Sequence, residues 1–417
     1  MSALAEDLRR LCAAADDAGL SSVNSDFGKL TTRAARALAT PATIDELQAI
    51  VRYASAQKIP LCLRGLAHSQ NGQSLCDDAI IVSTRSLTRY QLTRDEAVAE
   101  AGVLWSTLVR DAAEFGATPR VLTMFTGLTV GGTLSVGGVG ANSFNYGMQT
   151  EQVLALAVVT ADGERHACTP GDALFDAVRG TLGTCGIIAE ARIPLRAAAP
   201  TMSGLRFGYS DFVKLLADLD RTAESGVAQF VYGLIRPADV RNGELRGTLC
   251  VGIEGDAPAD LAPGAQLTMP AVTFPLGSSH FFAASEPWPD KPVVSPWTDL
   301  IFAWDQAPAL FERWRAHGLM DLLAAGDTAL IRLPSGRGLM GCFPQVPSDK
   351  HAALLDVVRA IGRVCREEFG GGNYLSGYLP FPHEASWASH FGTRWPALQA
   401  AKRQFDPHGV LHPGLIF

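Results

Sequence analysis

The chain has 417 residues, 47% of them apolar and 18% charged, and its formal net charge is −7 at neutral pH. This length exceeds what one hydrophobic core usually serves, so we expect two domains. The acidic balance and the lack of any Lys- or Arg-rich run exclude nucleic acid and an anionic membrane as main partners, which leaves a small-molecule substrate. No apolar run reaches membrane-spanning length and the first ten residues lack a signal-peptide pattern, so we expect a cytoplasmic protein.

The first half of the chain reads as short strands that alternate with helices. Thr43 to Glu46 has capping-box spacing and is followed by apolar residues with helical period, which predicts a helix over 43–56. Such alternation is typical of an α/β arrangement. Further strands are expected at 60–63, 79–82, 98–101, 153–160, 165–169 and 186–193, and further helices at 105–115 and 172–178.

The pattern changes near residue 196. An Ala- and Pro-rich stretch over 196–200 predicts a linker and therefore a domain boundary. The stretch 255–297, rich in Pro, Ala and Gly, is either an irregular segment near the site or a surface insertion. After the linker, strand-like runs at 230–235, 249–253 and 329–333 and helical runs at 211–222, 307–322 and 350–369 predict antiparallel strands with covering helices.

The cysteines and histidines do not form a metal-binding pattern. The eight cysteines are scattered and never form C-x-x-C, so we expect reduced, mostly buried thiols. His408 and His412 have the spacing of a possible ligand pair, but Pro413 follows them and no other ligands cluster nearby. We therefore expect no metal site.

The segment from Arg64 to Gln73 carries the strongest functional signal. It directly follows the apolar run 59–63, which predicts a strand that runs into a loop of small residues. Such a loop lets backbone N–H groups approach a diphosphate while the imidazole of His68 projects from the turn. The alternative is an ordinary solvated histidine in a Gly/Ser turn.

A second segment, Thr129 to Gly140, is rich in glycine and hydroxyl residues that can converge on a phosphate or a flavin edge. It contains neither G-x-G-x-x-G nor G-x-x-x-x-G-K-[ST], so neither a Rossmann fingerprint nor a P-loop is indicated.

Four segments in the same order resemble the cytokinin dehydrogenases, of the vanillyl-alcohol-oxidase or PCMH-type flavoproteins. They are 64–73, 129–160, 174–188 and 378–417, which cover most of the chain outside its middle part. The resemblance implies an α+β, two-domain PCMH-type FAD-binding fold with a separate antiparallel-sheet substrate domain. The implied limits are an FAD-binding domain over 1–196, a substrate (cap) domain over 197–372 and a C-terminal segment over 373–417 that returns to the first domain.

The resemblance also implies the cofactor and its contacts. FAD is expected to be bound covalently through His68, and Gly127-Leu128 in place of the second cysteine of bicovalent relatives implies a single tether. Ala67 replaces a family glycine, a small change that still permits close backbone approach provided that its φ is negative. For each glycine the alternative is an ordinary turn. The other implied FAD contacts are Gly65, Leu66, Ala67, Ser69, Gln73, Thr129, Gly131, Gly132, Ser135, Val139, Ile188 and Tyr378.

Several family positions differ in this chain. Met124 occupies the position of the aspartate that polarises the substrate amine, and Tyr232 falls where the family has a glutamate, so oxidation of cytokinin itself is not expected. His412 and Leu415 replace a serine and a glutamine expected to touch FAD, which puts those terminal contacts in question.

The catalytic base must then come from elsewhere. Tyr232 is the first candidate, with a buried core tyrosine as the alternative reading. Tyr378 is a candidate for orienting substrate, and Arg332 for binding a carboxylate or stabilising developing charge. Asp305 is either a base or a helix cap.

The sequence therefore predicts an FAD-dependent oxidase or dehydrogenase that takes hydride from a small, largely apolar substrate, in specialised metabolism. Two alternatives stay open: an amine oxidoreductase similar to cytokinin dehydrogenase, and a flavin-bound protein that catalyses a cyclisation without net electron transfer. The electron acceptor, oxygen or another molecule, and the oligomeric state are left open.

Overall fold

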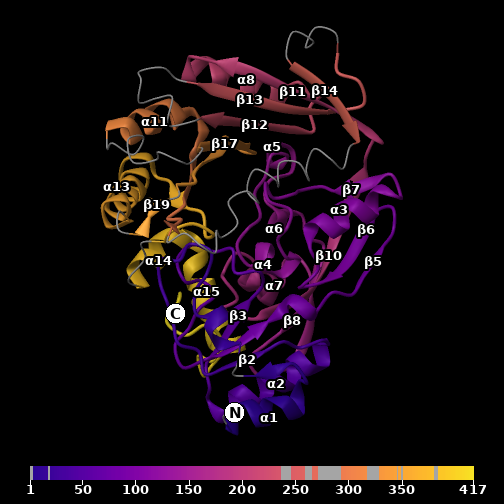
Figure 1. The fold of residues 1–417 in the computed structure, drawn as a ribbon, viewed down its shortest axis with the longest axis vertical. Helices are drawn as coiled ribbons and strands as arrows, with labels where there is room; N and C mark the ends of the chain where they lie inside the picture. The colour runs from indigo at the N-terminus through magenta and orange to yellow at the C-terminus, as the bar shows by residue number, and fades with distance from the viewer. Residues whose placement is uncertain are drawn as a thin grey trace.

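The computed structural model describes residues 3–16, 19–235, 246–258, 265–270, 293–316, 328–344, 346–348, 351–379 and 384–417. Within these ranges the first part of the chain builds two sheets with their helices, and the middle part builds a large antiparallel sheet at the opposite end of the molecule (Figure 1). The predicted α+β class with a separate antiparallel-sheet region is confirmed.

The N-terminal sheet carries the loop that contains His68. Its strands lie in the order β1 (Ala15–Asp16), β2 (Ala37–Ala39), β4 (Ile80–Ser83) and β3 (Leu61–Arg64), and both neighbours of β4 run parallel to it. Helices α1 (Ala3–Leu11) and α2 (Ile44–Gln57) pack beside it. The predicted helix cap is confirmed, since the Thr43 hydroxyl accepts from the N–H of Glu46 at 3.1 Å.

The second sheet of this region is antiparallel. Its order is β5 (Tyr90–Leu92), β6 (Glu96–Glu100), β10 (Ile187–Ala197), β8 (Ala155–Val159) and β9 (Arg165–Cys168), and β7 (Ala117–Pro119) also pairs with β10. The helices of this part of the chain are α3 (Trp105–Ala113), α4 (Val130–Leu134), α5 (Ser143–Tyr146), α6 (Gln149–Gln152) and α7 (Ala173–Val178). Two short 3-10 turns come before them in the chain, namely η1 (Leu20–Val23) and η2 (Thr84–Ser86).

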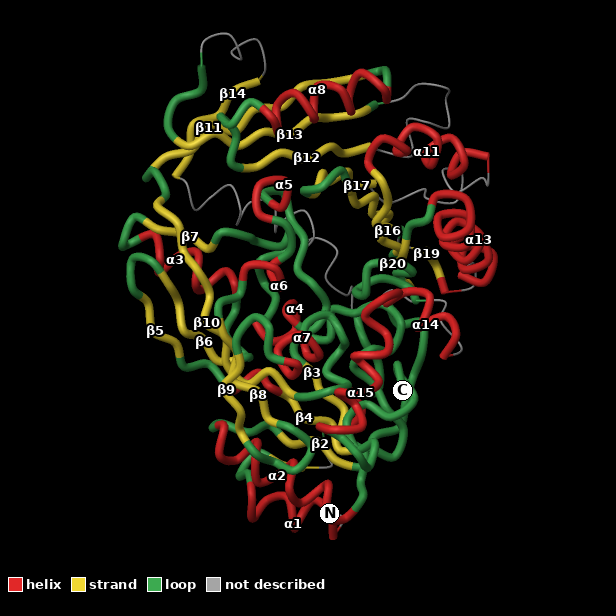
Figure 2. The backbone as a smooth tube through the Cα atoms, turned by 180° about the vertical axis from the view of Figure 1, so that it is seen from behind, coloured by secondary structure: helices red, strands yellow, loops and turns green. Residues whose placement is uncertain are grey.

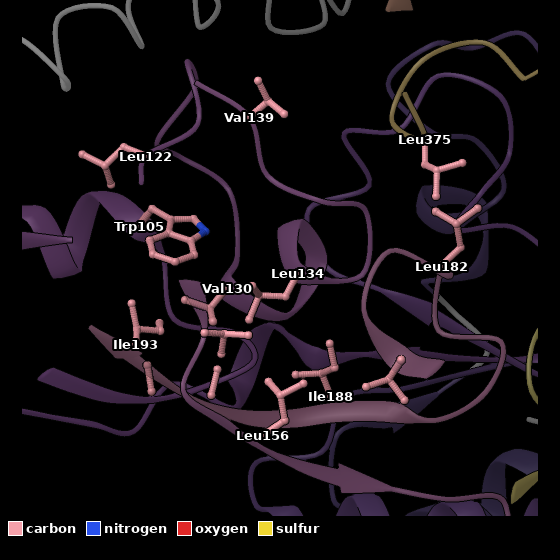
Figure 3. Close-up of a cluster of buried hydrophobic side chains, with 14 of the residues drawn as sticks. Trp105, Leu122, Val130, Leu134, Val139, Leu156, Leu182, Ile188, Ile193 and Leu375 are labelled. Carbon is pink, nitrogen blue, oxygen red and sulfur yellow. The ribbon is translucent and has the colours of Figure 1, made fainter. Parts of the chain in front are cut away.

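Part of the glycine-rich segment folds as helix α4 rather than as loop. Val130 and Leu134 are four residues apart, so both point to one side and lie above Leu156 of β8 and Ile188 of β10 (Figure 3). Trp105 of α3 fixes the helix from the side by donating to the Thr133 hydroxyl at 2.7 Å. This packing orients the glycines at the start of α4.

The middle part of the chain contains an antiparallel sheet of eight strands within the described residues. Their order is β14 (Ala265–Pro270), β11 (Thr201–Tyr209), β13 (Gly247–Glu254), β12 (Phe230–Ile235), β17 (Thr328–Leu333), β18 (Arg337–Cys342), β16 (Thr298–Ala303) and β20 (Gly372–Asn373). Helices α8 (Phe212–Glu224), α11 (Ala307–Ala316) and α13 (His351–Phe369) pack on one face (Figure 1). The turn η4 (Trp304–Gln306) precedes α11, and β15 (Val293–Val294) pairs with β19 (Val346–Pro347).

The predicted linker coincides with a change of sheet, because β10 ends at Ala197 and β11 begins at Thr201. The predicted helix over 307–322 is observed up to Ala316, and its remainder lies outside the described residues. Much of the stretch 255–297 also lies outside them.

The C-terminal segment crosses back from one region to the other. Its strand β20 still pairs with β16 of the eight-stranded sheet, so the predicted limit at 372/373 falls inside this strand. Helices α14 (Glu384–Phe391) and α15 (Trp395–Phe405), with the turn η6 (Gly392–Arg394) between them, then lead to the first region, where Leu411 pairs in parallel with Leu61 (Figure 2). The chain end thus lies beside the strand that leads to His68.

None of the described helices combines the length and apolarity that a bilayer-crossing segment needs. The eight cysteines, all at described positions, form no disulfide, and each is buried apart from Cys76, which is half-buried.

Candidate active site

One cavity lies where the two regions and the C-terminal segment meet. All the residues that the family resemblance assigns to FAD line it except Tyr378, namely Gly65, Leu66, Ala67, His68, Ser69, Gln73, Thr129, Gly131, Gly132, Ser135, Val139 and Ile188. The middle part of the chain and the C-terminal segment contribute Trp297, Asp299, Ala329, Ile331, Leu339, Phe343, Tyr374 and Ser376 to the same wall. Residues far apart in the sequence therefore form one enclosure.

The loop over 64–73 is held from two sides. The buried carboxylate of Asp26 accepts from the N–H of Gly72 at 2.6 Å, and its pKa is raised to about 6, mainly because it is withdrawn from water. On the other side, the Gln73 side chain donates to the carbonyls of Leu375 at 3.1 Å and Gly377 at 2.9 Å. The C-terminal segment thereby fixes the conformation of the loop.

The fixed loop presents unpaired hydrogen-bond donors. The backbone N–H groups of Leu66, Ala67, His68 and Ser69 donate to no group in the described part of the chain, although all four residues line the cavity. Consecutive N–H groups of this kind bind phosphate oxygens. The donor set of this wall therefore fits the diphosphate of a dinucleotide.

The condition of a negative φ at Ala67 is not met. Its φ is +52°, in the left-handed region that an L-residue adopts at a cost of about 1–2 kcal/mol. Neighbouring bonds impose this conformation, because the Ala67 carbonyl accepts from the N–H of Phe27 at 2.9 Å and the Ser69 carbonyl from that of Gly28 at 3.2 Å. The backbone still approaches the cavity closely, but through a strained residue.

His68 is surrounded by aromatic rings. Its imidazole centroid lies 4.2 Å from that of Phe27, 4.9 Å from that of Phe125 and 5.8 Å from that of Trp297. Withdrawal from water lowers the pKa of His68 to about 4, so the imidazole is neutral near pH 7. A neutral ring keeps a nitrogen lone pair for bond formation.

Glycines at the cavity allow close backbone approach. A Cβ atom at Gly65 would lie 2.5 Å from the Thr129 hydroxyl oxygen, and one at Gly131 would lie 2.7 Å from the Cβ atom of Ala101. The hydroxyl of Tyr374 accepts from the N–H of Gly138 at 2.7 Å, which joins the glycine segment to the C-terminal segment.

The predicted catalytic residues do not line the cavity. Tyr232 is buried in the core opposite Cys250 on β13, as in the alternative reading of the sequence. Arg332 forms ion pairs with Asp220 at 3.1 Å and Glu224 at 2.6 Å on α8. The Tyr378 hydroxyl accepts from Arg359 of α13 at 2.9 Å, and Asp305 is exposed in η4.

Asp299 is the site residue that the sequence analysis missed. It lies in β16, where Thr298, Leu300 and Phe302 alternate with it and are buried. Since successive strand residues point to opposite faces, Leu300 and Phe302 pack into the core under the helices while Asp299 lines the cavity. Recognising 298–303 as a strand would have indicated that face.

The residues that differ from the family pattern lie at different distances from the cavity: one lines it and two do not. Met124, at the family's aspartate position, lines the cavity. His412 is buried, and its Nε2 accepts from the N–H of Leu63 at 2.6 Å, so it supports β3 without being among the residues that line the cavity. Leu415 packs on the hydrophobic core of the first region.

Comparisons with known proteins agree with this architecture. Residues 35–169 match the family described as FAD binding domain, and residues 340–417 match that described as cytokinin dehydrogenase 1, FAD and cytokinin binding. An uncharacterized oxidoreductase, ORF5 in the fasciation locus of Rhodococcoides fascians, is 30% identical over 96% of this chain and 97% of its own length. Cytokinin dehydrogenase 6 of Oryza sativa subsp. japonica is 28% identical over 94% of this chain and 88% of its own.

The fold has a solved counterpart. The structure of 6-hydroxy-D-nicotine oxidase from Arthrobacter nicotinovorans superposes with a TM-score of 0.73 at 20% identity, and the match covers 96% of each chain. Together with the full-length sequence relatives, these matches show that the chain belongs to the FAD-dependent oxidoreductases of the vanillyl-alcohol-oxidase (PCMH-type) superfamily and is similar to the cytokinin dehydrogenases.

Proposed function

We propose that this oxidoreductase takes hydride from a small, largely apolar substrate and passes it to FAD bound covalently through His68. The observation that carries the proposal is the position of the His68 imidazole in the cavity wall, directly within the run of unpaired N–H groups over 66–69. When bound, FAD supplies the two-electron acceptor that amino-acid side chains lack.

The chain's own residues would hold and shield the cofactor. The N–H groups over 66–69 would bind the diphosphate, and the Gly131 and Gly132 backbone would allow close approach of the ring system. Neutral His68 would form the bond to the isoalloxazine, since a protonated imidazole has no free lone pair.

The substrate side of the cavity is mostly apolar. Its side chains include Met124, Phe125, Leu128, Trp297 and Phe343, which suit a small hydrophobic molecule and exclude water from the reacting carbon. We keep specialised metabolism as the proposed context and leave oxygen and other acceptors as alternatives. Reoxidation of the reduced protein in air, followed on an oxygen electrode, decides between an oxidase and a dehydrogenase.

Acid precipitation tests the covalent bond. The yellow colour is expected to stay with the precipitated polypeptide, and mass spectrometry should find the added flavin on the peptide that contains His68. H68A should release its flavin into the supernatant, whereas H166A, which removes an exposed histidine on β9, should retain it. A colourless wild-type precipitate contradicts the covalent bond, and a protein that never takes up flavin contradicts the whole proposal.

A further inference from the structure

Asp299 is the only carboxylate among the described residues that line the cavity. It is 5% exposed, and the apolar side chains in the same lining include Trp297, Ile331 and Phe343. A buried carboxylate in apolar surroundings costs free energy unless it is neutralised or paired. Its presence in this wall therefore calls for a functional explanation.

The surrounding structure makes room for this carboxylate but gives it few hydrogen bonds. Asp299 lies directly opposite Gly341 on β18, where a Cβ atom would come within 2.3 Å of Oδ1. The side-chain hydrogen bond found for it comes from the Ser376 hydroxyl to Oδ2, at a long 3.3 Å. One carboxylate accepts several hydrogen bonds, so Asp299 keeps acceptor capacity for a molecule in the cavity.

The groups that face Asp299 do not neutralise it. Cys342 of β18 and Tyr374 of the C-terminal segment both have pKa values raised by burial, so both are uncharged near neutral pH. His68, in the same cavity wall, is also neutral. Arg366 of α13 donates to the Asn373 side chain at 2.8 Å, rather than to Asp299.

We propose that Asp299 is the catalytic residue that accepts the substrate proton, from an N–H or O–H group on the carbon that is oxidised. This inference rests on the proposed function. The C–H bond breaks and its hydrogen leaves with both electrons to the flavin, while the N–H or O–H bond breaks and its proton passes to an oxygen of Asp299. A C=N or C=O bond forms, so atoms and electrons balance, and the substrate leaves as an imine or a carbonyl compound.

The electrostatics suit this role. Burial raises the pKa of Asp299 to about 7, so near neutral pH it is poised between accepting and releasing a proton. The hydrogen bond from Ser376 lowers the pKa and so favours the charged form. Met124 at the family's acid position cannot accept a proton, and Asp299 supplies this capacity from β16 of the antiparallel sheet.

The proposal sets the substrate class. The molecule is apolar, to match the cavity, and has one hydrogen-bond donor on the oxidised carbon, to match Asp299. Amines and alcohols share this chemistry. Benzylamine, N-methylbenzylamine and benzyl alcohol represent it, and toluene has the same ring without the donor.

The test measures flavin reduction in the intact holoenzyme without oxygen. With the donor-bearing probes, D299N should lower the limiting reduction rate by about 100-fold or more and remove the rise of this rate with pH through about 7. D305N, the same change at an exposed position outside the cavity, should match the wild type. S376A should move the midpoint of the pH profile upward, a shift that a purely structural role of Asp299 does not explain.

A second measurement does not depend on turnover. The infrared difference spectrum between wild type and D299N should contain the band of the protonated Asp299 carboxyl group. This band should disappear as the pH rises, with a midpoint near pH 7. If D299N retains its flavin but reduces it at a rate within threefold of the wild-type rate, or with the wild-type pH profile, the role of Asp299 is overturned. The proposed function is not affected by that outcome. If wild-type flavin is reduced by none of the donor-bearing probes, the proposed hydride transfer from this class fails as well, and reduction by toluene also contradicts the proposal.

Discussion

Lys402 and Asp406 form an ion pair that is withdrawn from water, with Nζ and Oδ2 2.6 Å apart. Lys402 also donates to the carbonyls of Thr184 at 2.8 Å and Leu411 at 2.9 Å. Asp406 accepts from the backbone N–H groups of Val410 and Leu411, each at 2.8 Å. Because Leu411 lies beside Leu61 in β3, the pair fixes the C-terminal segment against the strand that leads to His68.

Removal of one partner of this pair should be strongly destabilising. D406A leaves the buried ammonium of Lys402 without its counter-ion and two backbone N–H groups without their acceptor. We expect it to lower the free energy of unfolding by about 3–5 kcal/mol. E312A, which breaks the exposed pair with Arg315, should cost less than about 1 kcal/mol. Urea unfolding of the three proteins measures the difference, and equal midpoints for the two variants contradict the assignment.

Asp26 should make stability depend on pH. Its folded pKa of about 6 lies above the usual 3.8, so its contribution to stability is fully present below pH 3.8 and is lost as pH rises through about 6. D26N removes this titration. The stability of D26N relative to wild type should therefore increase by up to about 3 kcal/mol between pH 4 and 7. Unfolding midpoints at both pH values check this, with D305N as the exposed control.

Ala67 offers a test of backbone strain. A67G removes the cost of a left-handed L-residue but increases the entropy of the unfolded chain, so we expect a change between zero and about 1 kcal/mol of added stability. A54G, at a buried position inside α2, should destabilise by about 1 kcal/mol or more. Thermal unfolding compares them, and a loss at residue 67 as large as that at residue 54 would rule out the strain.

Tyr374 and Tyr232 should respond differently to loss of their hydroxyls. Y374F leaves the N–H of Gly138 without its acceptor, which we expect to cost about 1–3 kcal/mol and to shift the flavin absorbance bands. Y232F, away from the cavity, should leave the bands and the rate of flavin reduction unchanged. Absorbance spectra and stopped-flow reduction report both effects. A band shift in Y232F would return that tyrosine to the site.

The sequence predicted those parts of the fold and cavity where a local pattern has one physical solution. Thr43 and Glu46 specify a helix start, and the small residues around His68 specify a loop that approaches a ligand closely. The placement of Tyr232 could not be predicted in the same way. Residues of β12 are buried on both faces, so alternation alone does not say which face meets the cavity.

Asp299 and Ala67 depend on long-range contacts. The carboxylate reaches the cavity because β16 pairs with β18 and β20, and no local signal in 298–303 specifies those partners. The positive φ of Ala67 follows from hydrogen bonds to residues 27 and 28, about forty positions earlier. Both features arise only once the separate segments have assembled.

The return of the chain end from β20 to β3 has a consequence for folding. A fragment that stops near residue 196 would lack Leu411 beside β3 and would leave the carbonyl of Thr184 without Lys402. Phe230 and Ile331 of the eight-stranded antiparallel sheet pack in the same hydrophobic core as residues of the first region. Neither half is self-sufficient, so the two regions are expected to unfold together and to complete folding only after the segment with Lys402 and Leu411 has been synthesised.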